Sequence, residues 1–277
     1  MREKLNKFSF FLICFSLISI AYGQQKPNVV VVLVDDLGYS DLGCYGGEIP
    51  TPNIDALAAQ GVKFSNFYNA ACCCPSRTAL LTGIYPHEAG VGHMMEDKGE
   101  DHPAYRGHLN NKNVTIAEVL KSAGYFTAMT GKWHVGQARG VIPSNRGFDR
   151  SLNAPAGGFY YGDGKNAKLF LDGKPIANDS QELPKNWYST DLWTQFGLSF
   201  IDEAVAAKKP FLLYLAHNAP HFPLQAPQEE IDKFRGKYKA GWKKFREDRY
   251  QKQISLGLIP ASYKLPPMNQ NVPDWES

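Results

Sequence analysis

The sequence contains few cysteines, and their arrangement excludes an exported protein held together by disulfides. Only five of its 277 residues are cysteine, and three of them are adjacent, at Cys72, Cys73 and Cys74. Neighbouring cysteines are badly placed to bridge one another, and zinc sites usually space their ligands as C-x2-4-C. Cys14 lies in the N-terminal apolar run, so only Cys44 and the triplet remain beyond it. Stability must therefore come from a packed core.

A large excess of charge is also missing. The formal net charge is +3, and Arg2, Lys4 and Lys7 against Glu3 contribute +2 of it, which leaves the rest of the chain near +1. This balance gives no electrostatic basis for binding nucleic acid or an anionic membrane surface. A composition of 43% hydrophobic and 21% charged residues is that of an ordinary globular chain, of one large domain or two small ones.

Long hydrophobic runs are absent beyond the N-terminus. The apolar stretch 8–20 follows basic residues and ends in Ala21-Tyr22-Gly23, which predicts a signal peptide over residues 1–23 and a single domain over 24–277. An uncleaved anchor would need a longer run, and lipoprotein processing at Cys14 would need a small residue where Ile13 stands. We therefore expect an exported protein, periplasmic or secreted, with no stable membrane insertion after cleavage.

Strands and helices alternate along the chain. Continuous apolar runs at 28–34 and 211–216 predict strands buried on both faces, and Tyr125 to Thr130 predicts another. Capping signals and apolar periodicity predict helices at 51–61, 115–123 and 190–208. This order indicates an α/β fold with a largely parallel sheet. Residues 153–187 are expected to form an inserted loop over the site, and the basic stretch beyond Pro223 a solvated helix face.

The cysteine triplet stands at the start of another predicted helix. Pro75 suits its first turn, Arg77 lies near its positive end, and Gly83 suits a left-handed C-cap. A reactive side chain just before a helix N-terminus, with an arginine beside it, is suited to meeting an anion. The plainer interpretation is a cysteine-rich turn before an ordinary buried helix.

This stretch resembles the signature of the sulfatase family, Cys-x-Pro-Ser-Arg followed by Leu-Thr-Gly. Aligning Pro75-Ser76-Arg77 with the signature places the key cysteine at Cys73. The resemblance implies that Cys73 is oxidised to formylglycine by a maturation enzyme, a formylglycine-generating partner. It also implies a catalytic role for Arg77, which would stabilise the hydrated aldehyde and anchor a carboxylate.

Asp35-Asp36 follows the first predicted strand, at the sheet edge where open α/β sheets bind ligands. Adjacent carboxylates repel each other and favour a hard cation, Ca²⁺ or Mg²⁺. Taken alone, such a pair indicates a turn more often than a metal site. Asp36 lies 37 positions before Cys73, a separation that resembles that of the family. The resemblance implies a metal site of Asp35, Asp36 and Cys73 that holds Ca²⁺ in preference to Mg²⁺.

Two further motifs complete the resemblance. The run Gly131-Lys132-Trp133-His134 implies that Lys132 binds the sulfate and that His134 contacts a hydroxyl of the hydrated formylglycine, with Trp133 as a pocket wall. The run His217 to Pro223 resembles Pro-His-x-Pro and places a substrate-binding, catalytic histidine at His221. For His217, a supporting role and simple packing stay open.

The resemblance covers residues 28–277 but only the N-terminal portion of a sulfatase, because no late Asp-Asn pair follows Pro223. It implies an alkaline-phosphatase-like α/β/α sandwich, truncated at its C-terminal side, and hydrolysis of a sulfate monoester. The alternatives are a phosphonate or phosphate ester hydrolase of the same superfamily and an inactive truncated remnant. The substrate would be a sulfated small molecule or carbohydrate, whose ring could be met by Tyr160, Tyr161 and Trp187.

Overall fold

A computed structural model describes residues 26–164 and 167–275 of the chain. The predicted signal peptide therefore lies outside the described residues. The described part forms a six-stranded sheet in the order β1-β6-β2-β3-β4-β5. The strands are β1 (Val29–Leu33), β2 (Phe126–Lys132), β3 (Arg150–Ala154), β4 (Leu169–Leu171), β5 (Lys174–Ile176) and β6 (Phe211–Ala216).

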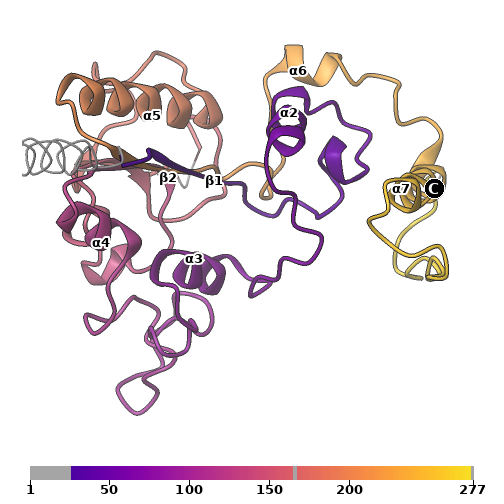
Figure 1. Ribbon diagram of the computed structural model, residues 1–277. Helices are drawn as coiled ribbons and strands as arrows, with labels where there is room; N and C mark the ends of the chain where they lie inside the picture. Colours follow the sequence, from indigo (N-terminus) through magenta and orange to yellow (C-terminus); the bar gives the residue numbers. More distant parts are fainter. Residues whose placement is uncertain (1–25, 165–166, 276–277) are drawn as a thin grey trace, which may run out of the picture.

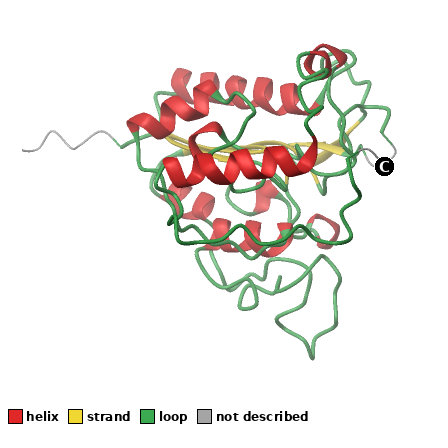
Figure 2. Cartoon of the chain, turned by 90° about the vertical axis from the view of Figure 1, so that its right-hand side faces the viewer, coloured by secondary structure: helices red, strands yellow, loops and turns green. Residues whose placement is uncertain are grey.

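Helices cover both faces of this sheet, which gives the expected α/β/α sandwich (Figure 1, Figure 2). Helix α5 (Ser189–Ala206) lies on one face, and α3 (Cys73–Thr82) and α4 (Ile116–Ser122) lie on the other (Figure 1). The remaining helices are α2 (Pro52–Gln60), α6 (Gln228–Asp232) and α7 (Gly241–Ser255). Within the part of the chain that the structure describes, none of the helices is long and apolar enough to cross a membrane.

The centre of the sheet matches the sequence prediction closely. Strand β6 has the predicted bounds, and it pairs in parallel with both β1 and β2. Strand β2 runs two residues further than expected, to Lys132, because it pairs in parallel with β3 from Ala128 to Lys132. Four parallel strands thus end at one edge, and the residues that follow them meet there.

Strand β1 corrects an expectation, because it is buried on one face only. Val29, Val31 and Leu33 pack against the core beneath the sheet, whereas Val30 and Val32 are 51% and 56% exposed. Strand β1 is one of the two edge strands of the described sheet, and β6 is its single neighbour there. The apolar run therefore correctly predicted a strand. Which face of that strand is covered depends on the strand's position in the sheet.

The helices follow their capping signals with one exception. Thr115 and Glu118 form the predicted capping box at the start of α4, with both of its hydrogen bonds present. Thr51 precedes α2 as expected, but its hydroxyl makes no capping bond. It donates to the carboxylate of Asp55 and accepts from the backbone N–H of Gly43 instead.

The segment 153–187 is only partly the loop that the sequence predicted. Strands β4 and β5 form a hairpin that pairs antiparallel to β3 and extends the sheet. The segment also contributes Phe159, Leu169 and Trp187 to the core on the α5 side. Beyond Pro223 the expected solvated helix is present as α7, of which only Gly241 is buried.

Candidate active site

Cys73 begins helix α3 and does not precede it as predicted. Cys72 is the N-cap residue in extended conformation, and Cys74 is fully buried. Gly83 ends the helix with φ 70°, the predicted left-handed cap. The first turn therefore presents Cys73, which is partly exposed, at the positive end of the helix.

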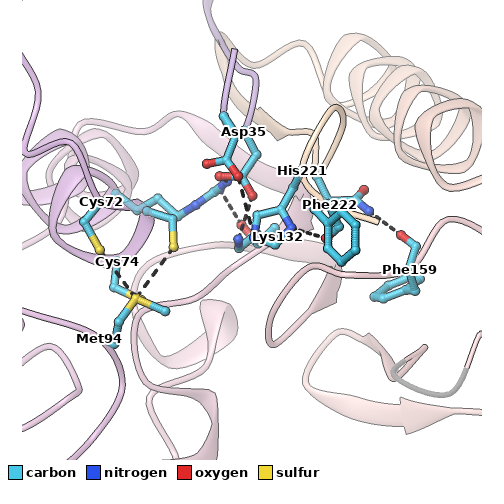
Figure 3. A network of polar contacts seen from close by, with 12 residues as sticks. Asp35, Cys72, Cys74, Met94, Lys132, Phe159, His221 and Phe222 are labelled. Carbon is cyan, nitrogen blue, oxygen red and sulfur yellow. Dashed lines mark hydrogen bonds and ion pairs between the residues drawn. The ribbon is translucent and has the colours of Figure 1, made fainter. Parts of the chain in front are cut away.

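Arg77, Lys132 and Asp35 form a buried ionic triad (Figure 3). The Nη2 of Arg77 lies 3.1 Å from Oδ1 of Asp35, and Nζ of Lys132 lies 2.6 Å from Oδ2. Arg77 also donates from Nη1 to the backbone carbonyl of Lys132 at 2.8 Å. Both cationic side chains are 1% exposed, and they come from α3 and the end of β2. Two cations against one carboxylate leave a local positive excess that favours an anion.

The backbone at the end of β2 explains how Lys132 reaches this position. Gly131 has φ +103°, and a Cβ there would lie 1.9 Å from the carbonyl oxygen of Ala216. Only glycine allows this close approach to β6. Gly131 is therefore required for the close packing of β2 against β6, and this packing sets the position of the adjacent Lys132.

Two hydrogen bonds join the loops that follow neighbouring strands. The N–H of Asp35 donates to the carbonyl of Ala219 at 3.0 Å, and that of His134 donates to Pro155 at 3.0 Å. The first bond brings His221 beside the aspartate pair, with Nε2 3.7 Å from Oδ2 of Asp36. The structure thus gathers the predicted site residues from β1, β2, β6 and α3 at one sheet edge.

Asp35 and Asp36 do not face the same way. The Asp35 side chain is 5% exposed and points into the triad, whereas Asp36 has φ 61° and a side chain that is 56% exposed. Both line a cavity of about 280 Å³ together with Cys73 and Asn69. Their oxygens suit a hard divalent cation in kind. Both oxygens of Asp35 are already in ion pairs, so the described residues supply few free oxygen ligands.

The neighbours of Cys73 lower the pKa of its thiol. A hydrogen bond from Cys74 and, beyond the opposing effect of burial, a bond and charge from His134 and the charge of Lys132 lower the pKa of Cys73 to about 3. The same pairing raises the pKa of Cys74. His134 is 8% exposed, and its Nδ1 has no hydrogen-bond partner among the described residues. Cys73 is thus the activated thiol of the triplet.

Met94 was missed by sequence reasoning. It lies in the loop between α3 and α4, and its Sδ is 3.4 Å from Sγ of Cys72, 4.0 Å from Cys73 and 3.8 Å from Cys74. Nothing in its sequence neighbourhood marks it, because a single methionine 20 residues from Cys74 has no pattern to reveal the contact.

Tyr160 and Asn218 also belong to the site's framework. The Tyr160 hydroxyl donates to the carbonyl of His221 at 2.7 Å, and burial raises its pKa to about 12. The Asn218 Oδ1 accepts from Nε1 of Trp193 at 2.8 Å, inside the run that carries His221. In the sequence, only the position of Asn218 between His217 and Ala219-Pro220 pointed to this anchor.

Several predicted pocket residues are core residues instead. Trp133 is fully buried and donates to the carbonyl of Val141 at 2.7 Å, so it is no pocket wall. Tyr160 and Trp187 are 1% and 4% exposed, whereas Tyr161 is half-buried. Trp187 still forms part of the wall of a cavity that Tyr161 also lines. Burial lowers the pKa of His217, and its Nδ1 has no hydrogen-bond partner in the described chain, which favours packing over a supporting role.

Comparison with known proteins identifies the family. The sulfatase family model matches residues 27–268. The chain belongs to the sulfatase family. It is 39% identical over 256 residues to an uncharacterized sulfatase of Schizosaccharomyces pombe, covering 86% of this chain and 46% of that protein. It is 36% identical over 267 residues to an arylsulfatase of Klebsiella aerogenes, covering 92% and 55%.

Solved structures agree with this sulfatase fold. The crystal structure of Ps i-CgsB in complex with k-i-k-neocarrahexaose matches with a TM-score of 0.66 and 34% identity, over 84% of this chain and 55% of that one. The structure of BT4656 in complex with its substrate D-glucosamine-2-N,6-O-disulfate matches with a TM-score of 0.60 and 29% identity, over 76% and 38%. The chain spans about half the length of the curated sulfatases it matches.

Proposed function

We propose that this sulfatase chain carries the nucleophile and the anion-binding half of an active site that hydrolyses sulfate monoesters. The observation that supports it best is the position of Cys73, at the positive end of α3 and beside the buried cations Lys132 and Arg77. Three positive groups converge where a sulfuryl group would meet residue 73. An anionic ester is the substrate class that such a site favours.

Each side chain of the proposed active site then has a chemical role. Formylglycine at residue 73, once formed and hydrated, would supply an oxygen nucleophile, and a divalent cation held by Asp35 and Asp36, Ca²⁺ in our proposal, would supply positive charge there. Lys132 binds a sulfuryl oxygen, and Arg77 fixes Asp35, which with Asp36 would hold the cation. His221 gives a proton to the departing oxygen, and His134 takes one from residue 73.

The proposed substrate is a sulfated carbohydrate. Ps i-CgsB and BT4656 were solved with the carbohydrate ligands named above, and this chain shares their fold at 34% and 29% identity. Tyr161 and Trp187 line a cavity of about 860 Å³ with Asp163, Asn178 and Gln225, which offers polar groups and two aromatic rings to a sugar. Export to the periplasm or medium, after cleavage behind Gly23, would place the protein with such polymers.

The modification is tested by expressing the chain with a formylglycine-generating enzyme and labelling aldehydes with an aminooxy probe. We expect label on residue 73 only, located by tandem mass spectrometry, and unchanged labelling in Cys74→Ser as the matched control. Label on residue 72 or 74, or none at all, contradicts the assignment of Cys73.

Recognition of the ester is tested by calorimetric titration of the converted chain with 4-nitrophenyl sulfate. Lys132→Ala should weaken binding by about tenfold or more, the scale of one lost charge-assisted contact. Lys121→Ala, which removes a partly exposed lysine paired with Asp149, is the control and should change nothing. Equal binding in both variants would contradict the role of Lys132. Tighter binding of phenylphosphonate than of the sulfate would favour the phosphonate hydrolase.

A further inference from the structure

Four sulfur atoms converge at the first turn of α3. The Sδ of Met94 lies within 4.0 Å of the Sγ atoms of Cys72, Cys73 and Cys74, so three thiols and one thioether share one small volume (Figure 3). The hydrolysis proposed above uses only residue 73 and leaves the other three sulfurs without a task. We refer to these four residues as the sulfur cluster.

A nitrogen ligand completes the group. The Sγ atoms of Cys73 and Cys74 and one ring nitrogen of His134 all lie within 4.8 Å of one another. His134 is 8% exposed, and its Nδ1 is buried without a hydrogen-bond partner in the described residues. A buried ring nitrogen without a hydrogen-bond partner is costly unless a ligand meets it.

The sulfur separations suit a single bound ion. Metal–sulfur bonds of about 2.3 Å place two sulfur ligands about 3.8 Å apart around a tetrahedral ion and about 4.0 Å apart around a trigonal one. The observed separations from Met94 are 3.4, 3.8 and 4.0 Å. Small rotamer shifts would therefore place these sulfur atoms at bonding distance from one shared metal ion. Met94 is 38% exposed, which leaves a route by which the ion can enter from solvent.

We propose that the chain with Cys73 still a thiol binds one Cu(I) ion in the sulfur cluster, through Cys73, Cys74 and Met94, with His134 at its edge. Soft thiolate and thioether ligands select Cu(I), whereas zinc takes thiolate, imidazole and carboxylate ligands and no thioether. Met94 therefore decides between the two metals. This site shares residue 73 with the predicted carboxylate site but binds its ion through sulfur, whereas the oxygens of Asp35 and Asp36 suit a hard cation.

The test uses the full chain expressed without a maturation enzyme, so its outcome does not depend on sulfate hydrolysis. Cu(I) is titrated anaerobically in competition with the chelator bicinchoninate, and Zn²⁺ is titrated separately. We expect one Cu(I) per chain. Met94→Leu should weaken Cu(I) binding by at least about tenfold, because loss of an outer partner alone can cost that much, and leave Zn²⁺ affinity unchanged. Leucine conserves the volume, so the fold should persist.

Controls separate the cluster from general thiol binding. Cys44 lies outside the sulfur cluster, and its thiol is hydrogen-bonded to Asp55, so Cys44→Ser should leave Cu(I) affinity unchanged. Cys74→Ser should lower that affinity. X-ray absorption of the Cu(I)-loaded chain should show sulfur ligands and lose one in Met94→Leu. Wild-type Cu(I) affinity in both Met94→Leu and Cys74→Ser would overturn the site. If Cu(I) affinity falls in Cys74→Ser but not in Met94→Leu, and the chain binds Zn²⁺ more tightly than Cu(I), the choice of metal would be overturned.

Discussion

Replacing Asp35 or Asp36 by asparagine should have very different effects on stability, although the two residues are adjacent and identical. Asp35 is the only carboxylate paired with Arg77 and Lys132 in the described structure, at 3.1 and 2.6 Å, and both cations are 1% exposed. Asp35→Asn would leave two buried positive charges uncompensated. Breaking a buried ion pair in this way costs about 3–5 kcal/mol of unfolding free energy.

Asp36→Asn supplies the matched control. The Asp36 side chain is 56% exposed, and its ionic neighbour is His221 at 3.7 Å. A solvated pair of this kind contributes less than about 1 kcal/mol. The difference between the two variants therefore isolates burial, because the chemical change is the same.

The assay is urea unfolding followed by the fluorescence of the buried Trp133 and Trp193, in EDTA so that no bound cation contributes. With an m value of about 3 kcal/mol/M, the midpoint of Asp35→Asn should fall by about 1 M or more, and that of Asp36→Asn by less than about 0.3 M. Midpoints that agree within about 0.2 M would refute the argument that the triad, rather than the exposed carboxylate, carries the stabilising charge.

Three further results are expected. Because its neighbours lower the pKa of Cys73 to about 3, iodoacetamide should alkylate it at a rate that is nearly flat from pH 5 to 8. Cys44, whose pKa is raised by burial, should react much more slowly at pH 6, and mass spectrometry that finds Cys44 alkylated first at that pH would contradict this. The converted 277-residue chain in excess Ca²⁺ should hydrolyse an aryl sulfate close to background, because Asp35 and Asp36 supply few of the roughly six to eight oxygens that Ca²⁺ takes; robust turnover would show that other ligands complete the site. Val32→Thr should reduce aggregation measured by light scattering, because it removes an apolar group from the exposed face of the edge strand, and unchanged aggregation would point to another surface.

Local sequence signals determined the elements on which the site stands. Strand β6 and the capping box of Thr115 and Glu118 match the structure because they depend on residues close in the chain. The first turn and the glycine cap of α3 match for the same reason. The spacing of Arg77 from Cys73 fixes both on one helical turn, so the sequence alone placed the anion-binding helix end.

Only the tertiary structure decided what those elements face. Arg77 and Lys132 are 55 residues apart, and both pair with Asp35. Asp35 points into this triad, whereas the side chain of the adjacent Asp36 is exposed. Met94 reaches the cysteines through a loop without periodicity, and Val30 and Val32 are exposed because no described element covers that side of β1. Local propensity acts between residues a few positions apart, whereas burial and ion pairing depend on which distant segments the sheet brings together.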